Sequence, residues 1–300
     1  MKRIILCLAL LISFYRITYS QGCNDAGFCT MGDMKPAQQI DSSKANIGIS
    51  TIFRLGEKET MQLTFQPQAD YYLWKSGKIS VQAPVHFIYG NLGFVAGLGD
   101  IAPSFTQRLY SKRETKLSIT LGGKIPVNNA NLRKDDKPLP MAYQLGQGTW
   151  DGIVGVNLFY KLWHYSLGFQ HNLNANGNQY IDSIYNNSSD IHYFDSQKID
   201  RGDDILLRIE RIFEKAGKSK YFLSILPIYR LQEATIENPK GERISVSSSS
   251  GLTLNINAGY LHSLGKNGKM KLLLGFPTIT RHVRPDGLTG TFVVSFSANW

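Results

Sequence analysis

His164 and Ser166, two residues apart, are the side chains whose types could most readily do chemistry. Alternate residues of an extended strand share a face, and a histidine beside a serine can act as its general base. A hydrolase would also need a third group that orients the imidazole, and none is evident in the sequence. Both residues lie on the polar side of their strand. We therefore expect polar structural residues here, and no enzyme.

A loop rich in Asn, Asp and Ser offers a second set of candidates, His192 and Asp195, with Asp190 and Asp200 nearby. These types suit a protease pair or a calcium site, but their spacing matches no known calcium motif. The glycine-rich stretch 97–100 is followed by a strand-like segment, whereas a phosphate-binding loop requires a helix there. We expect a solvated loop, no metal and no cofactor.

The start of the chain has the pattern of a secretory signal peptide over residues 1–20: two basic residues, an apolar run, and small residues before Gln21. A lipoprotein cysteine at Cys23 is the alternative, but residues 20–22 lack the aliphatic residue expected before it. Cys23 and Cys29 are expected to form a small disulfide, worth about 2 kcal/mol. A zinc site would need two more close ligands.

The formal net charge is +10. The basic residues are dispersed among turns and polar strand faces and do not cluster with stacking aromatics, which argues against nucleic acid. Three uses of this charge remain open: contact with anionic lipopolysaccharide, an ion preference of the lumen, and solubility of the loops.

The last twelve residues, 289–300, alternate between an apolar and a polar side and end in an aromatic residue. Phe296 and Trp300 lie on the apolar side. An exposed edge of this kind is hazardous in a soluble sandwich, which is the alternative, but it is expected in a closed barrel standing in lipid. The ending resembles the sorting signal that the outer-membrane assembly machinery reads.

Period-two alternation recurs through the rest of the chain, and no segment has the roughly 18 uninterrupted apolar residues of a membrane helix. The pattern predicts an all-β fold, an antiparallel transmembrane β-barrel of about twelve strands, over residues 44–300. The expected strands lie near 47–55, 61–73, 79–89, 94–110, 117–125, 150–160, 163–169, 205–213, 221–229, 252–260, 270–276 and 289–300.

Loop lengths and aromatic residues give the barrel two distinguishable ends. Long loops follow the fifth, seventh and ninth strands, including a polar loop over 127–148, whereas short turns follow the second, sixth, eighth and tenth strands. Aromatic residues gather beside the short turns, as in an interfacial girdle of the periplasmic side. Tyr89, Trp150 and Tyr229 are expected in the opposite girdle.

The inward faces combine charged and apolar residues, which an open aqueous pore would not need. Two explanations stay open: a route for a hydrophobic or amphipathic molecule, or a lumen packed by folded-in loops or by the polar segment 21–43, which suits a periplasmic plug. The candidate lumen or ligand residues are Arg54, His86, Lys116, Lys124, Leu206, Arg208, Glu210, Phe222, Leu226, Ile228 and Arg230.

Three short motifs occur in the order 97–101, 121–126 and 145–151, with the sequences GLGDI, LGGKIP and LGQGTWD. They resemble motifs of the transporter-like outer-membrane barrels named for the meta-pathway of phenol degradation. The start at 21–29 resembles mature outer-membrane proteins of Bacteroidetes. Val127 and Asn128 stand where the family often has Thr-Gly, which leaves the following loop and the substrate open. The motif residues are Gly97, Gly99, Asp100, Gly123, Pro126, Gly146, Gly148, Trp150 and Asp151.

The resemblance implies a channel for small hydrophobic or aromatic compounds, without a catalytic residue. We expect passive or gated uptake across the cell outer membrane, with membrane lipid, lipopolysaccharide, a small hydrophobic molecule and the barrel assembly machinery as partners. A structural or adhesive barrel that binds through loops 174–202 or 232–250 is the alternative. A barrel hydrolase, which Ser166→Ala would inactivate, is the third hypothesis.

Overall fold

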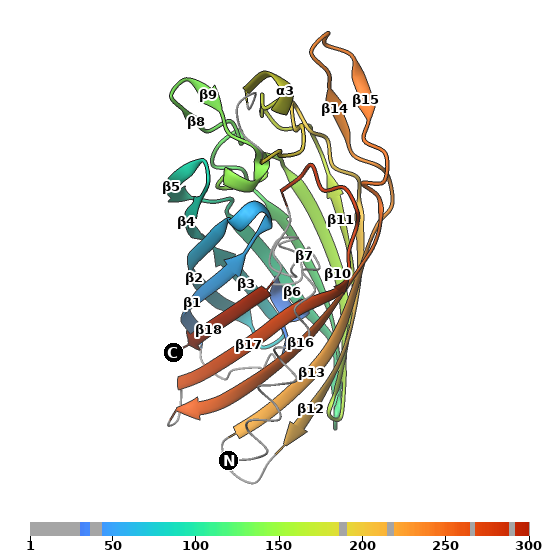
Figure 1. Cartoon of the computed structure of the whole chain (residues 1–300). Coiled ribbons are helices and arrows are strands. Elements are labelled where there is room, and N and C mark those ends of the chain that lie inside the picture. The colour runs from blue at the N-terminus through green and yellow to red at the C-terminus, as the bar shows by residue number, and fades with distance from the viewer. Residues whose placement is uncertain are drawn as a thin grey trace, which may run out of the picture.

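The computed structural model of the chain describes residues 31–36, 44–185, 191–214, 219–264, 268–287 and 292–299. Its main element is one antiparallel sheet that curves into a barrel (Figure 1). Strand β1 (Ala45–Leu55) pairs on one side with β2 (Met61–Trp74) and on the other with β18 (Phe292–Asn299), so the pairing closes on itself. The predicted all-β barrel is confirmed.

The described sheet contains fourteen strand segments, because two of the wall strands are interrupted. Both β3 and β4 pair with β2, whereas β5 pairs with β4 and β6 with β3. β3 and β4 therefore form one interrupted wall strand, and β5 and β6 form another. The fourteen segments make twelve wall strands, which is the predicted number. The remaining wall strands follow in chain order as antiparallel neighbours. The bounds are β3 Gly77–Gln82, β4 Val85–Gly90, β5 Gly93–Leu98, β6 Ala102–Lys112, β7 Thr115–Lys124, β10 Asp151–Tyr160, β11 Trp163–Asn172, β12 Asp204–Glu214, β13 Ser219–Arg230, β16 Gly251–Leu264 and β17 Gly268–Ile279.

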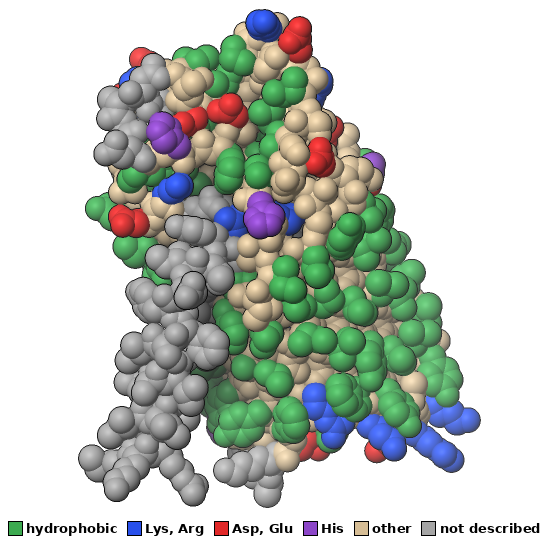
Figure 2. Space-filling view, turned by 45° about the vertical axis from the view of Figure 1, so that its right-hand side comes forward, with side chains coloured by type: hydrophobic (Ala, Val, Ile, Leu, Met, Phe, Trp, Pro, Cys, Tyr) green, Lys and Arg blue, Asp and Glu red, His purple; other side chains and the backbone are tan. Residues whose placement is uncertain are grey.

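The alternation of the sequence becomes an inside and an outside of the barrel. In β11, for example, Leu167 is 55% exposed whereas His164 and Ser166 on the other face are buried. Figure 2 shows hydrophobic side chains over the middle of the wall and charged groups toward both ends. Closed pairing satisfies the backbone within the ring, and the apolar exterior fits a bilayer.

Aromatic residues lie at the ends of the strands, as expected for interfacial girdles. Trp74 ends β2 and Trp163 begins β11, and both are exposed on the outside. The guanidinium of Arg211 lies 5.0 Å from the centre of the Trp163 ring and forms a cation–π contact with it. At the opposite end Tyr89, Trp150 and Tyr229 are also exposed.

The long loops build a cap over one end of the barrel (Figure 1). They contain the hairpins β8–β9 and β14–β15 and short helical turns, and no helix of the described ranges is long and apolar enough to span a membrane. The bounds are β8 Arg133–Lys134, β9 Lys137–Pro138, η4 Met141–Tyr143, α3 Asp182–Tyr185, β14 Thr235–Glu237 and β15 Arg243–Ser245, with η3 Glu57–Glu59 at the turn between β1 and β2.

The loop 127–148, predicted to be a polar loop, contributes an apolar core to this cap. Leu139, Tyr143 and Leu145 are buried against Tyr180 and Tyr193 of the next long loop. Gln144, between Tyr143 and Leu145, bonds to the loop backbone: it accepts from the Leu132 N–H at 2.8 Å and donates to the Leu139 carbonyl at 2.7 Å. The cap therefore narrows the lumen at this end.

Candidate functional site in the barrel lumen

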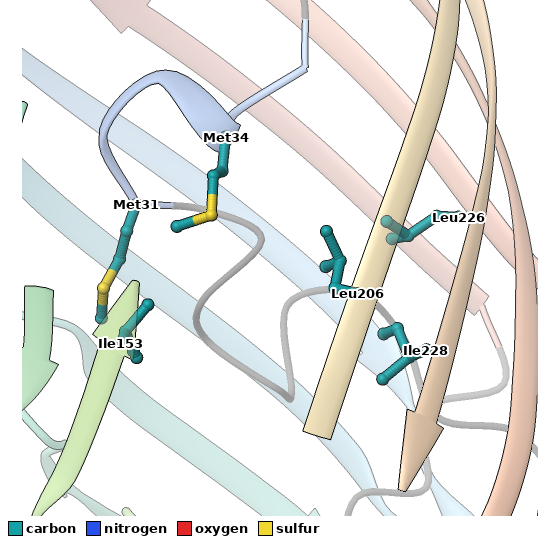
Figure 3. Packing of buried hydrophobic residues seen from close by; sticks show 6 residues of the cluster. All are labelled: Met31, Met34, Ile153, Leu206, Leu226 and Ile228. Atoms are coloured by element: carbon teal, nitrogen blue, oxygen red, sulfur yellow. The ribbon is translucent and has the colours of Figure 1, made fainter. Parts of the chain in front are cut away.

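The amino-terminal segment enters the lumen as a short turn, η2 (Gly32–Met34). Met31 and Met34 are completely buried and pack with Ile153 of β10 and with inward residues of β12 and β13 (Figure 3). The wall residues of this cluster include three of the predicted lumen residues, Leu206, Leu226 and Ile228. The apolar part of the lumen is therefore covered by the chain itself.

Polar contacts and close packing fix the position of this segment. Asp33 lies 3.4 Å from the Lys78 ammonium and accepts a hydrogen bond of 2.7 Å from Ser118. Gly32 has φ +48°, and a Cβ there would come within 2.4 Å of the Thr106 hydroxyl. A Cβ on Gly155 would meet the Met34 sulfur at 2.3 Å. The segment fits the wall only because these two positions carry no side chain.

A polar cavity of about 120 Å³ lies between the wall and the loop 139–147. Arg54, His86 and Lys124, predicted separately to face inward, line this cavity together. Arg54 donates to the Gln62 carbonyl at 3.1 Å, which turns the Gln62 amide nitrogen toward His86 Nδ1 at 2.8 Å. The Nδ1 atom therefore accepts, and the neutral imidazole carries its proton on Nε2.

The residues of the first and third motifs meet at this cavity. The Asp100 carboxylate accepts a hydrogen bond of 2.8 Å from the backbone N–H of Gln147. A Cβ on Gly146 would lie 2.1 Å from Asp100 Oδ1, and one on Gly99 would lie 2.3 Å from His86 Nε2. A Cβ on Gly97 would lie 2.6 Å from a methyl carbon of Leu145. Gly148 has φ +68°, a backbone conformation that favours glycine. These glycines allow the loop to approach the wall closely.

Asp151, from the end of the third motif, is the centre of a buried ion-pair network. Its carboxylate lies 2.8 Å from Arg201 and 3.7 Å from Lys124, and it accepts hydrogen bonds from Thr149 and Gln170. The adjacent Trp150 points to the outside and is 52% exposed. Gly123 pairs beside this site in β7, and Pro126 follows that strand.

A second network joins the predicted lumen residue Arg230 to the loop before β18. Arg230 pairs with Asp204 at 2.9 Å and with Asp286, which also lies 3.0 Å from Arg281. Burial acts to raise the pKa of Asp286, but the guanidinium groups of Arg281, Arg230 and Arg201 overcome it and hold that pKa well below its usual range. This network holds the loop 281–287 over the lumen.

Several residues of these networks were not among the sequence candidates: Arg201, Asp204, Arg281 and Asp286. They lie in loops or at strand ends, where no alternation predicts which side chains turn inward. Oppositely charged residues in two separate loops were the only signal, and the sequence does not show which of them meet.

The other predicted lumen residues lie farther along the interior. Arg208 and Glu210 are fully buried, Phe222 packs on Leu273, and Lys116 is half-buried near the start of β7. The His164 and Ser166 pair lies beside Glu210, with 2.8 Å between Nε2 and the hydroxyl oxygen and 3.6 Å between Nδ1 and the carboxylate. These three groups have the types of a hydrolytic triad.

The hydrogen bonds of this triad-like group run in the wrong direction for nucleophilic catalysis. The Ser166 hydroxyl donates to the Asn157 carbonyl oxygen at 2.7 Å. The contact with His164 therefore uses an imidazole N–H as donor, whereas a general base must accept the serine proton. The group is buried and connects β10, β11 and β12.

The acidic loop does not form a metal site in the described residues. Asp182 accepts from His192 Nδ1 at 2.6 Å, and Asp195 accepts from the Asp182 backbone, which closes a local turn. Across the described ranges, no three His, Cys, Asp or Glu side chains gather as a metal site. Phe296 of β18 is exposed, whereas Cys23, Cys29 and Trp300 lie outside the described residues.

Comparison with known proteins identifies the fold. No family model matches the chain, and no curated protein matches it. An outer-membrane channel from Pseudomonas putida F1 is similar in structure, with a TM-score of 0.61 and 11% identity over 88% of this chain and 98% of that one. The KdgM porin (TM-score 0.43, 6% identity, 85% and 98% covered) and the NanC porin (0.46, 4%, 84% and 97%) are more distant.

The first of these similarities shows a shared fold over nearly the whole chain. Together with the closed strand pairing, the apolar exterior and the aromatic residues at both ends, it identifies an outer-membrane β-barrel. The chain has the fold of the outer-membrane channels, and the cell outer membrane is its location.

Proposed function

We propose that the chain is an outer-membrane channel for small hydrophobic or aromatic compounds, gated by its amino-terminal segment. One observation carries this proposal: Met31 and Met34 occupy an apolar lumen surface formed by Leu206, Leu226 and Ile228. A purely structural barrel has no need of an apolar interior surface that a separate segment covers. A hydrophobic compound would take the place of the methionine side chains.

The polar contacts of the segment suit a removable plug. Asp33 bonds to Lys78 and Ser118, and Lys35 donates to Gln68, so the segment is held to the wall by a few side-chain groups. When cargo occupies the apolar surface, it displaces the side chains of Met31 and Met34. The polar groups of the segment then form hydrogen bonds to water in place of those to the wall. Passage then needs neither a cofactor nor ATP.

The cap supplies the second barrier on the route. The loop 139–147 and the loop 281–287 meet over the lumen, where Gln147 donates to the Asp286 carbonyl at 3.1 Å. Gated entry would therefore require movement of both the amino-terminal segment and the cap. Membership of the phenol-degradation-type family is part of this proposal, and the convergence of residues 97–100 and 145–147 on one cavity supports it.

The expected partners follow from the exterior of the barrel. The apolar wall would contact membrane lipid, and basic residues of the cap such as Lys134 and Lys137 would contact lipopolysaccharide phosphates. The alternating last strand with exposed Phe296 would be read by the barrel assembly machinery.

Binding of an apolar fluorophore to the refolded protein tests the cargo class. The barrel without residues 21–43 should bind the dye and the intact barrel should bind it weakly, because Met31 and Met34 compete. In the deleted barrel, Leu206→Gln should weaken binding about tenfold, whereas Ile244→Gln on the exposed β15 should not. Dye binding that is unchanged by Leu206→Gln in a folded barrel would contradict an apolar lumen site.

A further inference from the structure

The polar cavity presents chemistry that a hydrophobic cargo does not use. It lies between the strands of the wall and the loop 139–147, and Arg54, His86, Asp100 and Lys124 line it. Five side-chain amides share the lining: Gln62, Gln66, Gln82, Gln144 and Gln147. We propose that this cavity binds a small neutral polyhydroxylated compound, of the polyol or monosaccharide class.

Two buried acceptors in the lining point to a ligand that donates hydrogen bonds. Asp100 Oδ1 and Gln147 Oε1 have no hydrogen-bond partner among the described residues, although the other oxygen of Asp100 and the amide nitrogen of Gln147 are both bonded. Buried acceptors are rarely left without a donor, so a ligand or water must supply one. Because Gly146 has no side chain, Asp100 Oδ1 lies only 2.1 Å from the place where a Cβ of that residue would be.

Donors line the same cavity. His86 accepts at Nδ1 from Gln62, so its Nε2 carries a proton, and this nitrogen lies where Gly99 provides no side chain. The Lys124 ammonium is a second donor in the lining. A hydroxyl group both donates and accepts, and is therefore the ligand group that satisfies acceptors and donors of one cavity together.

Charge and size favour a neutral, small compound. A cation near Asp100 would also meet Lys124 and Arg54, whereas an anion near Lys124 would meet the Asp100 carboxylate and the Gln147 side-chain oxygen. The cavity of about 120 Å³ has room for several water molecules. A short polyol that replaces those waters would retain their hydrogen bonds.

Saturation-transfer NMR with xylitol tests the proposal on the full mature protein in a detergent without a sugar head group. Wild type should show transfer to xylitol, and ribose should compete. Gly146→Ala places a methyl group against Asp100 Oδ1 and should weaken binding at least about tenfold. Gly152→Ala is the matched control, because a Cβ there meets nothing within 4 Å.

Asp100→Asn provides an independent variant that keeps the size and the bond to the Gln147 backbone but turns one acceptor into a donor. It should also weaken xylitol binding about tenfold. The heat-dependent shift in gel mobility of folded barrels verifies folding of every variant. Three results would overturn the proposal. They are no saturation transfer to xylitol in wild type, xylitol binding by both folded variants that is as strong as in wild type, and binding of ethylammonium in preference to xylitol.

The polyol site and the apolar channel can fail separately. Xylitol binding depends on Asp100 and the loop 139–147, whereas dye binding depends on Leu206 and removal of Met31 and Met34. Gly146→Ala should therefore leave dye binding of the plug-deleted barrel unchanged.

Discussion

The Asp33 carboxylate lies 3.4 Å from the Lys78 ammonium inside the barrel, and both side chains are almost fully buried. This ion pair joins the segment that fills the lumen to the strand that forms its wall. Its strength therefore contributes directly to the balance between a closed and an open barrel.

Removing this pair should open the barrel. Lys78→Met leaves the Asp33 carboxylate buried without its cation, and we expect the open population to rise about tenfold, equivalent to about 1.4 kcal/mol. Single-channel recording of open probability measures the effect. Lys137→Met in the exposed β9 hairpin is the control. An open probability equal to that of wild type would show that the pair does not hold the segment.

The Asp286 network should stabilise the cap. Asp286→Asn leaves Arg230 and Arg281 buried without their shared carboxylate, and we expect unfolding in urea to require about 3–5 kcal/mol less free energy. Glu242→Gln in an exposed loop should change the free energy of unfolding little. If Asp286→Asn is as stable as this control, the network does not secure the fold.

The same network predicts how stability depends on pH. The pKa of Asp286 lies below its ordinary value in the folded protein, since the arginines outweigh the effect of burial. Its contribution is thus fully present above the unfolded pKa of about 3.9 and is lost as pH falls toward the lower folded pKa. The midpoint temperature of thermal unfolding of wild type should therefore fall below about pH 4. The part of this fall that comes from protonation of Asp286 should be missing in Asp286→Asn. Parallel pH curves for the two proteins would contradict this assignment.

Ser166→Ala separates a structural role from a catalytic one. Loss of the hydroxyl removes the hydrogen bond to Asn157 and the contact with His164, so the free energy of unfolding should fall by about 1–3 kcal/mol. Any hydrolysis of a p-nitrophenyl ester should be the same in wild type and variant. Ester hydrolysis that disappears with Ser166 in a folded barrel would establish the hydrolase hypothesis instead.

Leu167 tests the lipid-facing side of the wall. It is 55% exposed in the middle of β11, and Leu167→Arg should destabilise the barrel in liposomes by about 2–4 kcal/mol. Ile244→Arg, on the hairpin of the cap, is the control for a new charge outside the bilayer. Equal stability of the two variants would place Leu167 away from lipid.

Much of the wall could be predicted from the sequence because a strand with one side in lipid has a period of two. That pattern alone placed Arg54, His86 and Lys124 inside, and the structure has all three buried. It could not show that they share one cavity, since their heights in the barrel depend on strand register. The interruption near Pro84 did not disturb the alternation, and the glycines around Asp100 left the register of residues 94–110 ambiguous.

The cap and the ion-pair networks could not be predicted for a different reason. Leu139, Tyr143 and Leu145 lie in a stretch that is polar on average, and their burial comes from contact with another loop. The partners of Arg230 come from the start of β12 and from the loop before β18. Only the folded chain brings such distant residues together.

Planar-bilayer conductance of the mature protein, recorded beside a version lacking residues 21–43, tests the gated channel most directly. We predict that the intact barrel is quiet and that the deletion opens large conductance steps, because the lumen then loses Met31 and Met34. If both proteins stay closed while the deleted barrel is correctly folded, the cap and wall residues pack the lumen themselves. That result would contradict gating by the amino-terminal segment.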